Sequence, residues 1–129
     1  MKSMTIKDSY PIQTLELKKI ESKFPTTKEV VNYIEKQIEA HPVAAHIATF
    51  DHFMHTKNLP DHEMDESVVD IENVVFCFGK ELPVPQLAAV RPRSIAVVEY
   101  ADRFVISFMD APNPQAHEAM EKWVKGIKK

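Results

Sequence analysis

Two segments in the second half of the chain are apolar on both faces of the strand that each would form. The first is Ile71–Phe78, where Val74, Phe76 and Phe78 alternate with Ile71, Val75 and Cys77. The second is Arg103–Met109, where Phe104, Ile106 and Phe108 alternate with Val105 and Met109. Successive side chains of a strand point to opposite faces, so each of these strands needs a hydrophobic cover on both sides. The fold of this chain must supply two covers for its sheet.

Local signals predict two helices. Thr26 and Glu29 form a capping box in front of apolar residues at helical spacing, and His41-Pro42 ends that helix. A second helix begins after Asn113-Pro114 and carries one apolar stripe. Five strands are predicted from alternation and β-branched or aromatic runs: Tyr10–Lys18, Ala44–Phe53, Ile71–Phe78, Ser94–Tyr100 and Arg103–Met109. Between the second and third strands, Met54–Asp70 is polar and acidic and is expected to be a loop.

This order, β-α-β-β-β-β-α, predicts one α+β domain over residues 1–129. We expect a two-layer sandwich, in which two helices lie on one face of a mixed five-stranded sheet. A right-handed crossover would make the first two strands parallel. Two helices about 10 Å wide cover only about four strands spaced about 4.8 Å apart, so one face stays without helices.

The uncovered face leads to a prediction about partners. We expect a homodimer, or a larger homo-oligomer, in which each sheet face covers the other. The alternative is that Met54–Asp70 or the proline-rich segment Pro83–Pro92 folds over this face instead.

Composition excludes several classes of function. The net charge of −3 argues against a nucleic-acid partner. No apolar run is long enough to span a bilayer and Met1–Thr14 lacks a secretory leader pattern, so we expect a soluble, cytoplasmic protein with no membrane partner. Cys77 is the single cysteine, which excludes an internal disulfide and fits a reducing compartment. Two separated glycines exclude a glycine-rich phosphate loop.

The order of several short motifs resembles a known family. Ile47–His52 ends in Asp-His, Val74–Gly79 is an apolar strand that ends in Phe-Gly, and the stretches Ser94–Glu99 and Val105–Pro112 follow. This pattern resembles the bacterial domain-of-unknown-function family 302. The resemblance implies a compact α+β fold and a dimer, and it implies no reaction. The chain departs from that family at Lys80-Glu81 and at Arg93-Ser94.

Five of the six histidines lie between His41 and His62, among carboxylates. Imidazole and carboxylate are the usual ligands of zinc and other divalent metals. We therefore consider a divalent-metal site, such as a zinc site, at His52, His55 and His62, with His46 as a further ligand. The spacing matches no established metal motif, and the alternative is a polar strand edge followed by a solvated acidic loop.

A second candidate site combines a strand end with basic residues. Arg91 and Arg93 flank Pro92, and two guanidinium groups held in this way can bind a carboxylate or a phosphate. With Lys80, Asp51 and His52, they form a predicted site for a small anionic ligand. The alternative is that the arginines pair with the acidic loop. Cys77 lies in an apolar strand, so we expect a packing role for it and assign no catalytic residue.

Three hypotheses remain open from the residues alone. The chain is a non-catalytic ligand-binding or interaction domain, a metal-binding protein or metal-dependent enzyme that uses the His46–His62 cluster, or a homo-oligomeric scaffold without a small-molecule site.

Overall fold

The computed structural model describes all residues 1–129 and contains one antiparallel sheet of six strands. Its strands are β1 (Lys2–Ile6), β2 (Tyr10–Lys18), β3 (Ala44–Asp51), β4 (Val68–Phe78), β5 (Arg93–Tyr100) and β6 (Arg103–Met109). Across the sheet they follow the order β1-β2-β6-β5-β4-β3. The helices are α1 (Thr27–Ala40), α2 (His52–Lys57) and α3 (Pro114–Lys125), with short 3-10 turns η1 (Lys19–Glu21) and η2 (Pro85–Ala89). No helix is long and apolar enough to cross a membrane.

The α+β class and the five expected strands are confirmed, but the sheet has six strands and is not mixed. The connection through α1 carries the chain from β2 to β3 at the opposite edge, and β6, β5 and β4 fill the space between them. Each neighbouring pair is antiparallel, so β2 and β3 point the same way without touching. The extra strand, β1, pairs only with β2, and all five of its residues are exposed.

The ends of the long helices lie where the capping residues place them. The Thr26 hydroxyl accepts a hydrogen bond from the Glu29 amide at 3.3 Å, and α1 ends at His41, in front of Pro42. At the start of α3, the Asn113 side chain accepts from the Gln115 amide at 2.9 Å. Both side chains satisfy an amide that has no partner within its helix, which is why these termini follow from local sequence.

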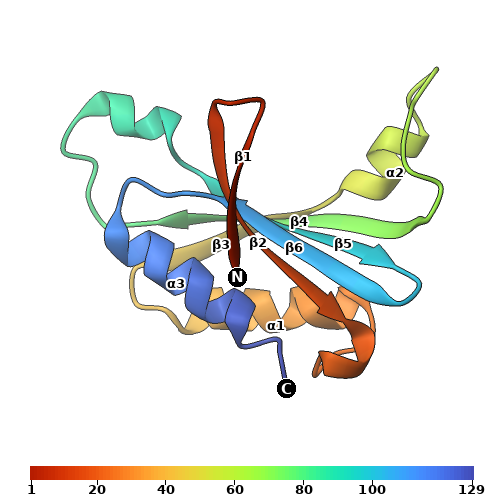
Figure 1. Ribbon diagram of the computed structural model, residues 1–129. Helices are drawn as coiled ribbons and strands as arrows, with labels where there is room; N and C mark the ends of the chain where they lie inside the picture. Colours follow the sequence, from red (N-terminus) through yellow and green to blue (C-terminus); the bar gives the residue numbers. More distant parts are fainter.

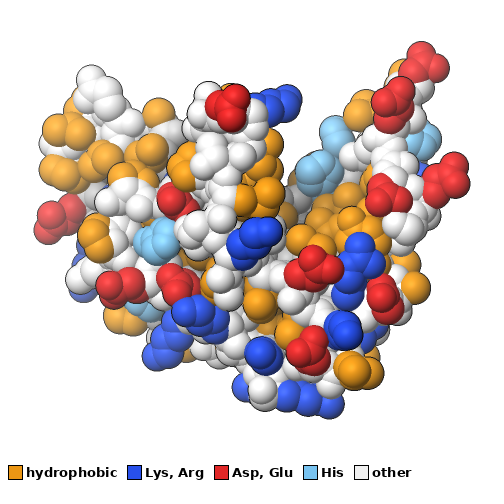
Figure 2. Space-filling view, viewed as in Figure 1, with side chains coloured by type: hydrophobic (Ala, Val, Ile, Leu, Met, Phe, Trp, Pro, Cys, Tyr) orange, Lys and Arg blue, Asp and Glu red, His pale blue; other side chains and the backbone are white.

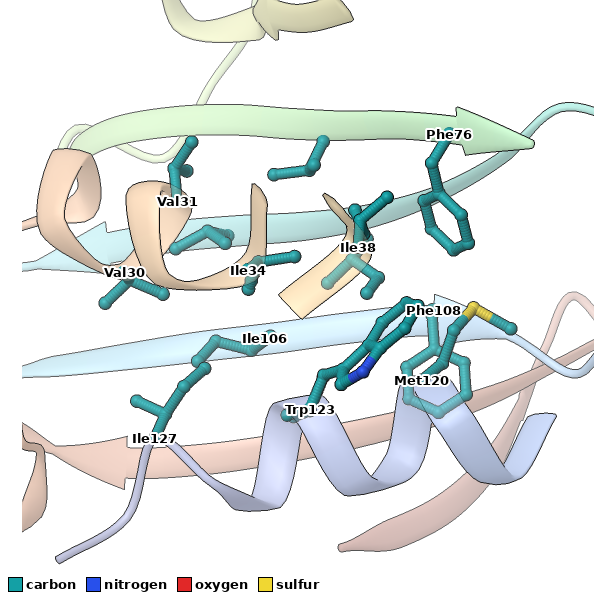
Figure 3. Close-up of a cluster of buried hydrophobic side chains, with 14 of the residues drawn as sticks. Val30, Val31, Ile34, Ile38, Phe76, Ile106, Phe108, Met120, Trp123 and Ile127 are labelled. Carbon is teal, nitrogen blue, oxygen red and sulfur yellow. The ribbon is translucent and has the colours of Figure 1, made fainter. Parts of the chain in front are cut away.

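A single core lies between the sheet and the two long helices. Figure 1 shows α1 and α3 against the same face of the sheet, and Figure 3 shows their apolar side chains meeting those of the strands. The buried apolar strand residues all belong to that face: Leu17, Val74, Phe76, Phe78, Ile95, Val97, Phe104, Ile106 and Phe108. The helices contribute Val30, Val31, Ile34, Ile38, Ala116, Met120, Trp123 and Val124. The expectation that two helices cover one face is confirmed, and the alternate strand residues lie on a face without helices.

The acidic segment after β3 is not only a loop. Asp51 caps α2 by accepting a hydrogen bond from the Met54 amide at 3.1 Å, and β4 begins as early as Val68. Helix α2 has 6 residues and none of them is buried. Because it has no buried face, its sequence shows no apolar periodicity. It rises from the sheet on the side opposite α1 and α3 (Figure 1).

Candidate functional site

The face of the sheet that α1 and α3 leave uncovered has a largely apolar floor. Register places Val105, Val98 and Ile71 side by side across β6, β5 and β4. The neighbouring row contains Ala96 and Asn73, followed by Phe50 on β3. None of these residues is buried. We call this surface the open face.

Several polar side chains on the open face already have partners within the chain. The Ser107 hydroxyl donates to the Thr14 hydroxyl at 2.8 Å. Nδ1 of His52 lies 2.7 Å from Oδ1 of Asn73. Because these groups are hydrogen-bonded, covering this surface would leave few polar atoms without a partner.

Three segments rise on the side of the open face and give it walls. Figure 1 shows η2, the β1–β2 hairpin and α2 projecting above the sheet. Figure 2 shows the hollow between the hairpin and α2, with hydrophobic and histidine side chains on its α2 side. Large apolar side chains are exposed on these walls and at the ends of the floor: Met4, Ile6, Tyr10, Phe50, Met54, Val84 and Met109.

The predicted metal ligands are only partly brought together. The rings of His52 and His55 lie 6.3 Å apart, and both rings contact Phe50. His62 lies further along the loop, with Nδ1 at 3.1 Å from the Leu59 carbonyl oxygen. His46 is on the other face, where Nε2 lies 3.0 Å from the Thr49 hydroxyl. No group of three or more side chains that could hold a metal ion is found. The zinc site therefore stays a prediction, and the three histidines do not form a closed ligand set.

The predicted anion-binding residues separate into two groups. Asp51 lies opposite Glu72 on β4, whereas Lys80 follows Phe78 at the other end of that strand. The six residues of β4 that follow Glu72, up to Phe78, span roughly 20 Å. Asp51 and His52 therefore lie far from the basic residues. Lys80 and Arg91 line one surface hollow, and Arg91 and Arg93 line another. The basic part of the set thus comes together without the acidic part.

Backbone groups hold both arginines. Nη2 of Arg93 donates to the carbonyl oxygens of Met109 and Asp110, at 2.5 and 2.9 Å. Nη1 of Arg91 donates to the Glu81 carbonyl oxygen at 2.7 Å. Burial lowers the pKa of Arg93, and the nearby charge of Asp110 raises it in part. The guanidinium of Arg91 also lies against Gly79, whose φ of 116° and missing side chain suit that close approach.

Sequence reasoning missed the contribution of β1 and α2 to the open face. The one available signal for β1 was the alternation of Lys2, Met4 and Ile6 with Ser3 and Thr5. In α2, six residues carry too little periodicity to separate a helix from a loop.

Comparison with known proteins places the chain in a family. The model of a family described as "Family of unknown function (DUF6858)" matches residues 1–129. The chain belongs to this family. No curated protein and no solved structure matches it.

This match corrects the resemblance to the bacterial domain-of-unknown-function family 302, which is wrong. The motifs behind that resemblance have local explanations. Asp51 of the Asp-His pair caps α2, and the apolar stretch before Gly79 alternates between the core and the open face. Such patterns recur in unrelated sheets, because capping and burial require the same residue types everywhere.

Proposed function

We propose that this protein is a non-catalytic interaction domain that pairs with a second copy of itself through the open face. The observation that carries the proposal is a six-stranded sheet whose two long helices lie on the same side. The opposite side presents Ile71, Val98 and Val105 together with exposed aromatic and methionine side chains. Large apolar surfaces of this kind are typical of association sites.

The size of the open face suits an interface. Four central strands about 4.8 Å apart and about seven residues long give a floor of roughly 450 Å². If half of that floor is apolar, burying it on two copies at about 25 cal/mol per Å² contributes roughly 11 kcal/mol. Association costs about 4–15 kcal/mol in lost freedom of motion. The walls must therefore contribute buried area as well. A standard interface buries about 800 Å² on each partner, which is more than the floor alone provides.

Charge favours a second copy as the occupant. The segment between α2 and β4 carries Asp61, Glu63, Asp65 and Glu66, and it lies beyond the end of β3 and the start of β4. At the opposite edge, β1 begins with Lys2, and its turn carries Lys7 beside Asp8 at the other end of the strands. A two-fold axis along the strands brings the β3 edge of one copy over the β1 edge of the other. The acidic segment of each copy then lies toward Lys2 of the other copy, outside an apolar centre.

Single substitutions on the floor test the proposal. Val75→Asp and Val105→Asp place a carboxylate in the proposed interface, and both positions are only partly buried in the single chain. We expect sedimentation at micromolar concentration to give about twice the 14.8 kDa chain mass for the wild type and the single-chain mass for each variant. The physical reason is the cost of burying an unpaired charge.

The matched control is Ile20→Asp, because Ile20 is 80% exposed in η1 and lies away from the open face. This variant should sediment as the wild type does. Circular dichroism of all three variants must show the native fold. A wild-type protein that sediments as a clean 14.8 kDa monomer up to high micromolar concentration contradicts the proposal.

A further inference from the structure

A second feature is a cavity under η2 at the end of the sheet. Its volume is about 260 Å³. It lies between η2, the end of β4, the start of β5 and the start of α3. Arg91, Arg93 and Asn113 provide polar groups to its lining. Phe78, Leu87, Val90 and Ala116 are among its apolar residues. The cavity thus has polar and apolar parts.

The charge of Arg91 and Arg93 is only partly offset within the chain, by Asp110 near Arg93. Neither Arg91 nor Arg93 takes part in any ion pair of the molecule. In Arg93, Nη2 is used by two backbone carbonyls, whereas Nε is buried and has no hydrogen-bond partner. Because Nε is shielded from solvent, a ligand in the cavity would meet the outer edge of the guanidinium group, where Nη1 makes no hydrogen bond within the chain. Two unpaired guanidinium groups in one cavity favour an anion.

The apolar part of the lining narrows the class of anion. Inorganic phosphate would satisfy the arginines but would leave the surface of Phe78 and Leu87 without a partner. A carboxylate fits the fork of a guanidinium group, and a short hydrocarbon chain fits the apolar lining. The volume of about 260 Å³ is below the usual range for drug-sized ligands, which indicates a small molecule.

We propose that this cavity binds a small amphipathic carboxylate, with its carboxylate at Arg91 and Arg93 and its hydrocarbon part against Phe78, Leu87, Val90 and Ala116. Lys80 and Glu81, whose charges offset each other, line an adjoining hollow together with Arg91. Asn113, which caps α3, adds its side-chain amide to the polar part of the lining. Binding at this site does not require pairing of two chains.

Titration calorimetry and thermal unfolding of the full chain with defined probes test the proposal. The probes are acetate, butyrate and hexanoate, with 1-hexanol as the uncharged analogue and inorganic phosphate as the simple anion. We expect affinity to rise about fourfold with each methylene that enters the cavity. Hexanoate should raise the melting temperature, because it binds the folded state. Hexanol and phosphate should bind at least tenfold more weakly than hexanoate.

Two variants separate the polar and apolar parts of the site. Arg91→Gln removes a charge from an arginine that contacts one backbone carbonyl, and it should weaken hexanoate at least tenfold. Val90 is 37% exposed. Val90→Asn should make the affinity rise less steeply with the hydrocarbon length of the probe, while the affinity for acetate stays the same. Arg103→Gln is the matched control, since Arg103 pairs with Glu16 and Asp102 and lies outside the cavity lining.

Three results would overturn the proposal. The first is no measurable binding of hexanoate by the wild type at millimolar concentration. The second is equal hexanoate affinity in the wild type and in Arg91→Gln. The third is phosphate that binds as tightly as hexanoate or tighter, which would indicate a site for simple anions.

Discussion

At the scale of single residues, Glu99 has the most consequential environment. It lies on the core side of β5 and is 8% exposed. Its carboxylate accepts hydrogen bonds from Lys19 Nζ at 2.8 Å, the Thr27 amide at 2.9 Å and the Thr27 hydroxyl at 2.7 Å. These contacts tie the end of β2 and the first turn of α1 to the centre of the sheet. Burial raises the pKa of Glu99, but the hydrogen bonds from Lys19 and Thr27 outweigh burial and lower it overall.

This lowered pKa predicts an acid-sensitive contribution to stability. A carboxylate with a lower pKa in the folded state stabilises the fold above its ordinary pKa, here about 4.5, and loses that effect as the pH falls through the folded value. We expect Glu99→Gln to reduce the free energy of unfolding at pH 7 by about 1–3 kcal/mol. The difference between wild type and variant should shrink below about pH 4. Urea denaturation across pH 3–8 measures both quantities.

The control for this prediction is Glu16→Gln, because Glu16 is an exposed partner of Arg103 and should change stability by less than about 1 kcal/mol. Asp70 and Glu72 act in the opposite direction. Burial, with nearby carboxylates, raises the pKa of both, so their protonation at low pH favours the folded state. The quantity to compare is therefore the difference in the free energy of unfolding between Glu99→Gln and the wild type at each pH. A difference that stays constant from pH 7 to pH 3 would contradict the role assigned to Glu99.

At the scale of elements, the beginning of α1 depends on one side chain. Thr26 is exposed, and its hydroxyl accepts from the Glu29 amide. We expect Thr26→Ala to reduce the free energy of unfolding by about 1 kcal/mol, because the amide loses its partner at the helix end. Thr26→Ser keeps the acceptor and should stay within a few tenths of a kcal/mol of the wild type. Chemical denaturation of the three proteins under the same conditions decides this, and an equal loss in both variants would point to the methyl group of Thr26 instead.

The elements differ in how far local sequence determines them. Both α1 and α3 have a capping residue and an apolar stripe over at least three turns, so their bounds follow from sequence. Helix α2 has a capping residue, Asp51, but no stripe, and β1 has alternation but no buried face. A single weak signal of either kind is common in loops, which is why sequence reasoning missed both elements.

At the scale of the whole molecule, β1 is an addition to a fold that closes without it. It pairs only with β2 and has no buried residue. A chain that begins at Ser9 should therefore unfold cooperatively, with a melting temperature close to that of the full chain when both are monomeric. Under the proposed function, the same truncation removes one wall of the open face together with Lys2 and Lys7, so it should weaken pairing. Thermal unfolding and sedimentation of the truncated chain measure the two effects separately, and loss of cooperative unfolding would show that β1 stabilises the core.

The local features of this fold follow from the order of its residues. Thr26 and Asn113 begin helices because their side chains satisfy amides a few residues away. The alternation in Ile71–Phe78 predicted which side chains share a face, and its two-sided apolar character predicted a sheet face that two helices leave uncovered. These properties depend on neighbours within about one or two turns of chain, so the order of residues is enough to derive them.

How those elements meet depends on contacts that local sequence does not describe. The strand order, with β6, β5 and β4 between β2 and β3, depends on contacts between residues far apart in sequence. The same contacts separate Asp51 and His52 from Lys80 and the two arginines. They also place Ala116 of α3 and Leu87 of η2 around one cavity with Arg93. Periodicity and capping carry no information on long-range pairing, because the free energy of a strand pair depends on which partner is present and not on the strand alone.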